Sequence, residues 1–100
     1  MAERIRVLVY YRCDDEAKIR DAYHVVSPRL SQVPGLLNNE LLASTHDPNS
    51  YIVLSEWTDR ETHRRWEQSQ EHLEQTAPLK PYLDNQLPMS FGIYEVKASY

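Results

Sequence analysis

Glycine and cysteine are scarce in this chain, whose 100 residues include two glycines and one cysteine, Cys13. Two glycines cannot build a GxGxxG turn or a glycine-rich phosphate loop, which excludes nucleotide-binding enzymes of those types. A single cysteine allows neither an internal disulfide nor a multi-cysteine zinc site, and this suits a reducing compartment. The four histidines lack the HExxH spacing, so we expect no metal site.

Long hydrophobic runs and blocks of basic residues are absent as well. The longest charge-free stretches, 30–39 and 85–94, have ten residues each, about half of a membrane span. The net charge of −4 gives no electrostatic reason to expect a nucleic acid partner. The first six residues lead into a charged strand without the apolar core of a signal peptide. We therefore expect one cytoplasmic domain over residues 1–100, with no membrane segment.

Hydrophobic periodicity and turn residues predict four strands and two helices. The strands are expected at 4–12, 36–45, 51–57 and 89–98, and residues 46–50 form a hairpin turn. The first helix is capped by Asp14 or Asp15 and ends at Pro34-Gly35. The order βαββαβ predicts a ferredoxin-like α+β fold, a four-stranded antiparallel sheet with two helices on one face.

Both helices carry an expected buried stripe. In the first helix it comprises Ile19, Tyr23, Val26, Leu30 and Val33, and Pro28 within it predicts a kink or short break. The second helix begins at a capping box, Thr58 to Glu61, and continues to about Gln75. Its buried face is expected to hold Thr62, Trp66, Ser69 and Leu73, and a short helical turn is expected within 82–87.

The predicted sheet has apolar residues on both faces, although two helices cover only one. The second face is expected to include Leu8, Tyr10, Ile52, Leu54, Phe91 and Ile93. A contiguous exposed patch of this kind marks an interface. We expect two sheets to pack face to face in a twofold homodimer, and the alternative is a monomer with scattered surface apolar residues.

Several short motifs occur in a characteristic order. They are Val33-Pro34-Gly35-Leu36, Asp47-Pro48 with Tyr51, Glu56-Trp57, Trp66 nine residues further on, and His72. On these motifs the chain resembles the antibiotic biosynthesis monooxygenase family of small dimeric α+β barrels, and the likeness covers nearly the whole chain. It looks most like the quinone-forming oxygenases of aromatic polyketide pathways.

The resemblance implies oxidation of an anthrone-type polyketide to a quinone by O2, without flavin, haem or metal. Two positions depart from the anthrone oxygenases of the family. A strand asparagine four residues before the tryptophan that matches Trp57 is here Val53, and a tyrosine six residues after it is His63. The mechanism therefore requires a different set of hydrogen-bond donors.

His63 is the first candidate for the base or donor, because its ordinary pKa suits proton transfer near neutral pH. It lies about 60° from Trp66 around the expected helix, so a hydrogen-bonded boundary histidine is the alternative. Trp57, which matches the family, is the second catalytic candidate through its indole N–H. Candidate substrate-binding residues are Trp66, Tyr51, Asn38, Tyr10, His72 and Tyr82, each with a structural alternative: core packing, a solvated face or a polar strand edge. Asn39 is a further source of the missing amide.

Two other functions fit the same fold. A cyclase or isomerase would position a reactive polyketide without consuming oxygen, and a binding subunit would hold it without turnover. The absence of an asparagine at Val53 favours the binding subunit as an alternative.

Overall fold

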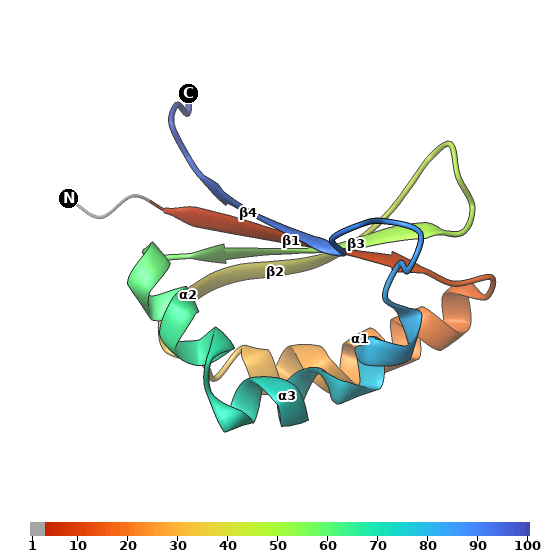
Figure 1. Cartoon of the computed structure of the whole chain (residues 1–100), viewed down its shortest axis with the longest axis horizontal. Coiled ribbons are helices and arrows are strands. Elements are labelled where there is room, and N and C mark those ends of the chain that lie inside the picture. The colour runs from red at the N-terminus through yellow and green to blue at the C-terminus, as the bar shows by residue number, and fades with distance from the viewer. Residues whose placement is uncertain (1–3) are drawn as a thin grey trace.

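The computed structural model describes residues 4–100, and its helices all lie on one side of a single sheet (Figure 1). The strands are β1 (Ile5–Arg12), β2 (Leu36–Ala43), β3 (Ser50–Trp57) and β4 (Phe91–Glu95). The helices are α1 (Glu16–Leu30), α2 (Arg60–Glu67) and α3 (Gln70–Thr76), followed by a 3₁₀ helix, η1 (Ala77–Tyr82). The strands pair antiparallel in the order β2-β3-β1-β4, which confirms the predicted ferredoxin-like α+β fold. The predicted single domain also includes residues 1–3, which lie outside the described part.

The core lies between the sheet and the helices. Its buried side chains come from the central strands β1 and β3, from α1 and from η1; they include Tyr11, Ile19, Val26, Leu30, Val53 and Leu79. A second cluster at the other end of the sheet joins Ile5, Val7 and Trp57. Because side chains alternate along a strand, the other face of β1 and β3 points away from every helix.

Helix α1 begins as predicted and ends earlier than predicted. The Asp15 carboxylate caps it by accepting a hydrogen bond from the backbone N–H of Ala17 at 3.0 Å. Of the predicted kink or short break at Pro28, the break is wrong, because the helix continues through this residue to Leu30. Pro28 lies in the last turn, so the hydrogen bond that it lacks is one of the last in the helix. Val33 therefore lies in the following turn.

The second helix of the prediction is two helices. The expected capping box starts at Thr58, whereas the cap of α2 is Asp59, one residue later. The Asp59 carboxylate accepts a hydrogen bond from the N–H of Thr62 at 2.7 Å. A break follows at Gln68, and the Ser69 hydroxyl caps α3 by accepting from the N–H of His72 at 3.3 Å. The restart changes the phase of the helix, and Leu73, predicted to be buried, is 58% exposed.

The predicted helical turn within 82–87 is also wrong, because this segment pairs with the sheet instead. Leu83 forms an isolated bridge with Tyr11, and the N–H of Asp84 donates to the carbonyl of Tyr10 at 3.0 Å. The 3₁₀ helix forms upstream, over a segment that contains Pro78 and Pro81. Residues after Tyr82 are thereby held against the end of β1.

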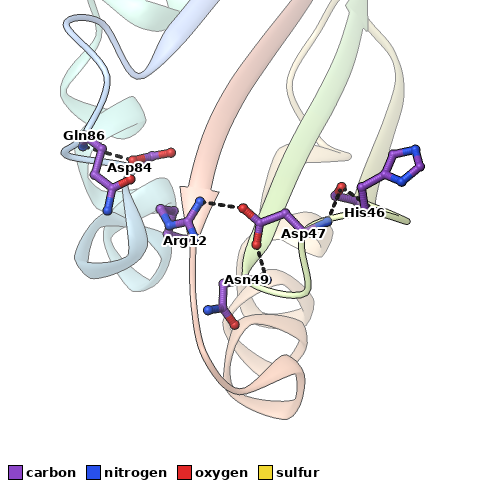
Figure 2. Close-up of polar contacts among 7 residues, drawn as sticks. Arg12, His46, Asp47, Asn49, Asp84 and Gln86 are labelled. Carbon is purple, nitrogen blue, oxygen red and sulfur yellow. Dashed lines mark hydrogen bonds and ion pairs between the residues drawn. The ribbon is translucent and has the colours of Figure 1, made fainter.

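Polar contacts stabilise two turns at this end of the sheet (Figure 2). The Arg12 guanidinium donates to the Asp47 carboxylate at 2.9 Å, and Asp47 also accepts from the backbone N–H of Asn49 at 3.0 Å. These bonds lower the pKa of Asp47, and the bond from Asn49 has the larger effect. Figure 2 shows Arg12 between this turn and the turn in which Asp84 accepts from the N–H of Gln86. The β2–β3 hairpin is thus fixed to β1.

The second face of the sheet, which we call the open face, is apolar as predicted, with a correction on β4. Phe91 and Ile93 pair with Val9 and Val7 and therefore lie on the helix side, although they are 43% and 38% exposed. The register of β4 with β1 places Tyr94 on the open face instead, with its ring over Gly92. The apolar residues of the open face are Leu8, Tyr10, Leu42, Ile52, Leu54 and Tyr94.

We predict that Gly35→Ala destabilises the protein by about 2 kcal/mol. Gly35 has a φ of +91°, and a Cβ there would collide with Cγ2 of Thr62. Urea unfolding measures the loss. Adding Thr62→Ala to the variant removes the collision and recovers part of it, because the positive φ stays unfavourable. Equal midpoints for the wild type and Gly35→Ala would contradict the prediction.

Candidate functional site

Four aromatic rings meet where β3 ends against α2 and α3. The Trp57 ring lies 5.1 Å from the His63 ring and 5.1 Å from the Trp66 ring, between centroids. His72, from α3, contacts the other side of Trp66 at 4.6 Å, with the two ring planes 82° apart. The structure thus brings together four of the predicted site residues. We call these four residues the ring cluster.

Both indole N–H groups of the ring cluster are already used within the protein. The N–H of Trp57, which is 1% exposed, donates to the Ser55 hydroxyl at 2.9 Å. The N–H of Trp66 donates to the Gln75 side-chain oxygen at 2.7 Å and so links α2 to α3. Neither indole N–H is therefore free for a ligand, and a donor to a ligand must come from another residue.

His63 is the more deeply buried of the two histidines in the ring cluster. It is 3% exposed, and burial lowers its pKa below the ordinary value, partly offset by the nearby Glu67 carboxylate. Burial lowers the pKa of the half-buried His72 in the same way. Both imidazoles are therefore neutral near pH 7, and a neutral imidazole is able to accept a proton. His72 packs against Trp66 and does not belong to the solvated helix face.

Apolar side chains extend the ring cluster across the sheet. Trp57 pairs with Ile5 on β1, and the next residue on the same face, Val7, pairs with Ile93 on β4. Trp66 packs against these side chains from the helix side. The ring cluster therefore lies at one end of an apolar strip that reaches the exposed edge of β4. A strip of this kind fits a flat hydrophobic ligand.

Two hollows open on the surface, one near the ring cluster and one toward the other end of the sheet. The larger, about 550 Å³, lies beside the start of α2 and is lined by charged side chains such as Asp59, Arg65 and Glu95. The smaller, about 180 Å³, lies between α1 and β2 and is lined in part by Leu41, Ala43 and Tyr51. In the second, these strand residues lie on one side, and the charged Glu16 and Arg20 of α1 lie on the other.

Four other predicted site residues lie away from the ring cluster. Tyr51 is buried at the opposite end of β3, and this burial raises the pKa of its phenol. Tyr82 is half-buried on η1 against the main core. Tyr10 and Asn38 lie on the open face, where the Asn38 amide donates to Glu40 at 3.3 Å.

Three polar residues lie inside the fold: Ser55, Tyr23 and Asn39. The sequence predicted no site role for Ser55 or Tyr23, and it offered Asn39 together with its neighbour Asn38. Ser55 faces the helices between Val53 and Trp57, as strict alternation along β3 requires. Asn39 pairs with Ser55 from β2, and the Tyr23 hydroxyl of α1 donates to the Asn39 carbonyl at 3.0 Å. The alternation of side chains along β3 is enough to place Ser55 on the helix side, whereas the placement of Asn39 depends on the register of β2 with β3.

Two kinds of feature are absent from residues 4–100. No three side chains of His, Cys, Asp or Glu in this range lie close enough to hold a metal ion together. No helix in it is long and apolar enough to cross a membrane.

The family comparison agrees with this fold and this arrangement of residues. The profile of the family described as "Antibiotic biosynthesis monooxygenase" matches residues 5–76, from β1 through the ring cluster to the end of α3. The chain belongs to the antibiotic biosynthesis monooxygenase family. The resemblance found in the sequence motifs is thereby confirmed.

Relatives of known name come from species of Streptomyces. Protein SchA of Streptomyces halstedii is 33% identical over 92 residues, which are 90% of this chain and 24% of that protein. Polyketide synthase CurD of Streptomyces cyaneus is 29% identical over 90 residues, again 90% and 24%. The chain therefore spans about a quarter of the length of these curated relatives.

Solved structures show the same fold over the full length. SnoaB, a cofactor-independent oxygenase from Streptomyces nogalater, matches with a TM-score of 0.79 at 18% identity, over 99% of this chain and 97% of that one. A conserved protein from Methanosarcina mazei matches with a TM-score of 0.73, also at 18% identity. At this identity the likeness establishes the fold.

We predict that stability falls as the pH decreases through about 6.5, the ordinary histidine pKa. His63 and His72 have lowered pKa values when folded, so the unfolded chain binds more protons below this pH and is favoured. The urea midpoint should be lower at about pH 5.5 than at about pH 7.5, and His63→Phe should reduce the difference. His46→Phe, in the exposed hairpin turn, is the control and should leave it unchanged; an equal slope in all three proteins would contradict the prediction.

Proposed function

We propose that this protein is a cofactor-independent oxygenase that converts an anthrone-type aromatic polyketide to a quinone with O2. The observation that carries the proposal is a buried neutral imidazole, His63, between two indoles beside an apolar strip. Membership of the monooxygenase family and the names of SnoaB and CurD support the same chemistry and substrate class. The substrate supplies the electrons, so the protein must bind it, orient it and remove a proton.

The proposed reaction begins with loss of a proton from the anthrone methylene carbon to the Nε2 or Nδ1 lone pair of His63. The delocalised anion gives one electron to O2, and the resulting radical and superoxide combine to form a carbon–oxygen bond. Protonation of this peroxide and loss of water leave the new carbonyl. One oxygen atom enters the quinone, and the other leaves as water with the two methylene hydrogens.

The other three residues of the ring cluster shape the site in this mechanism. Trp57 and Trp66 provide flat walls, with ring planes 30° apart. His72 packs edge-on against Trp66 and excludes water from its other side. A dry surrounding keeps His63 neutral and favours a charge-delocalised anion.

The test is oxygen uptake with dithranol, a dihydroxyanthrone, in the presence of a metal chelator and without flavin. We expect turnover by the wild type, one labelled oxygen atom in the quinone from labelled O2, and a loss of roughly a hundredfold in His63→Phe. His46→Phe is the matched control and should keep the wild-type rate. Conversion of a polyketide that continues without oxygen would instead support the cyclase or isomerase alternative.

We also propose that the open face pairs with the same face of a second copy. Its centre is apolar, while charges lie at both ends: Arg6 with Glu56 at 3.0 Å, and Arg12 with Asp47 at 2.9 Å. An apolar centre with a polar rim is the usual composition of a protein interface. Closure of two sheets would cover residues of β1, β3 and β4 that no helix covers.

The mass in solution tests the pairing. One chain has a mass of 11.8 kDa, and light scattering at micromolar concentration should give twice this value. Leu54→Arg places a charge in the middle of the open face and should give a folded monomer. Leu73→Arg, on the exposed side of α3, should remain a dimer. A wild-type mass of one chain would remove the proposal.

A further inference from the structure

One polar group inside the fold has no partner. The amide nitrogen Nδ2 of Asn39 is buried and forms no hydrogen bond with any group of residues 4–100. No other side-chain nitrogen or oxygen of residues 4–100 is both buried and without a hydrogen-bond partner. A buried donor without a partner destabilises a folded protein, so its presence calls for a physical reason.

The amide is held in a fixed orientation. Asn39 pairs with Ser55 across the β2–β3 ladder, on the helix side of the sheet. On α1, the Tyr23 hydroxyl lies 3.0 Å from the Asn39 carbonyl and 3.4 Å from its side-chain oxygen Oδ1, and donates to both. Because Oδ1 accepts from Tyr23, the Nδ2 end of the amide is the end that has no partner.

Asn39 also lies between two surfaces suited to an apolar ring. On one side, Ser55 leads to the Trp57 indole of the ring cluster through a hydrogen bond of 2.9 Å. On the other side, Leu41 follows on the same face of β2 and lines the smaller hollow of about 180 Å³. Ser55 accepts from Trp57, and beside it the Asn39 amide is a buried donor without a partner.

We propose that Asn39 Nδ2 binds the ligand of this protein by donating to a carbonyl or phenolate oxygen on a flat aromatic ring. This inference rests on the proposed function for the ligand class and assigns the donor that neither indole provides. Tyr23 is the positioning residue, because its hydroxyl fixes the side of the amide that faces the ligand. A free amide N–H selects an acceptor, so a ring without an oxygen at this point binds more weakly.

The proposal is tested first without any ligand. Asn39→Leu keeps the approximate shape of the side chain and removes the unpartnered donor, while Tyr23 retains the backbone carbonyl of residue 39 as its acceptor. We expect the urea midpoint of Asn39→Leu to equal or exceed that of the wild type. An asparagine that served the fold alone would give a lower midpoint.

Binding is tested with the dihydroxyanthraquinone formed from dithranol, followed by quenching of tryptophan fluorescence. We expect about tenfold weaker binding in Asn39→Leu and at least as large a loss in Asn39→Asp, which replaces the donor with an acceptor. Asn38→Leu, one residue away on the open face, is the matched control and should bind as the wild type does. Tyr23→Phe keeps the donor and should lose less than Asn39→Leu.

The outcomes separate this proposal from the proposed function. Binding within twofold of the wild type in both Asn39 variants would overturn the role of Asn39, even if the wild type oxidises dithranol. Weakened binding in those variants, together with no oxygen uptake by the wild type, would support Asn39 as the donor and remove the oxygenase function.

Discussion

Trp57 ends the central strand β3, and the rings of His63 and Trp66 on α2 pack against it at 5.1 Å each. Replacing a buried tryptophan of this kind with alanine costs about 3–5 kcal/mol. The contact sets the position of α2 over the sheet, and through Trp66 and Gln75 it also sets that of α3. The environment of His63 therefore depends on a packing contact rather than on a polar network.

The positions of the four strands follow from local patterns in the sequence, although the predicted strands at 36–45 and 89–98 are longer than β2 and β4. Alternation from Ile5 to Tyr11 and again in β3 predicted the central strands, and Pro34-Gly35 predicted the sharp entry to β2. Alternation along β4 defines two sets of residues and leaves open which set faces the helices. Phe91 and Ile93 were assigned to the wrong face for this reason, since only the pairing with Val7 and Val9 decides it.

The site depended on an interruption that periodicity does not show. A continuous helix from the capping box to Gln75 would place Leu73 beside Trp66 and leave His72 in solvent. The Ser69 hydroxyl begins a new helix, and the change of phase exposes Leu73 and turns His72 onto Trp66. A serine within a helical pattern starts a new helix only when its hydroxyl accepts from a backbone N–H in the new first turn. Whether it does so is decided by the tertiary structure.

A single residue in β2 decides which of two adjacent asparagines lies inside the fold. Leu36 pairs with Trp57 and faces the helices, so strict alternation would place Asn38 inside and Asn39 outside. The ladder instead shifts between Leu36 and Asn38, and Leu37 is the extra residue. A bulge of this kind redirects every side chain that follows it, and here it places Asn39 opposite Ser55. Because the shift is set by the pairing of β2 with β3, the sequence alone could name both asparagines but could not choose between them.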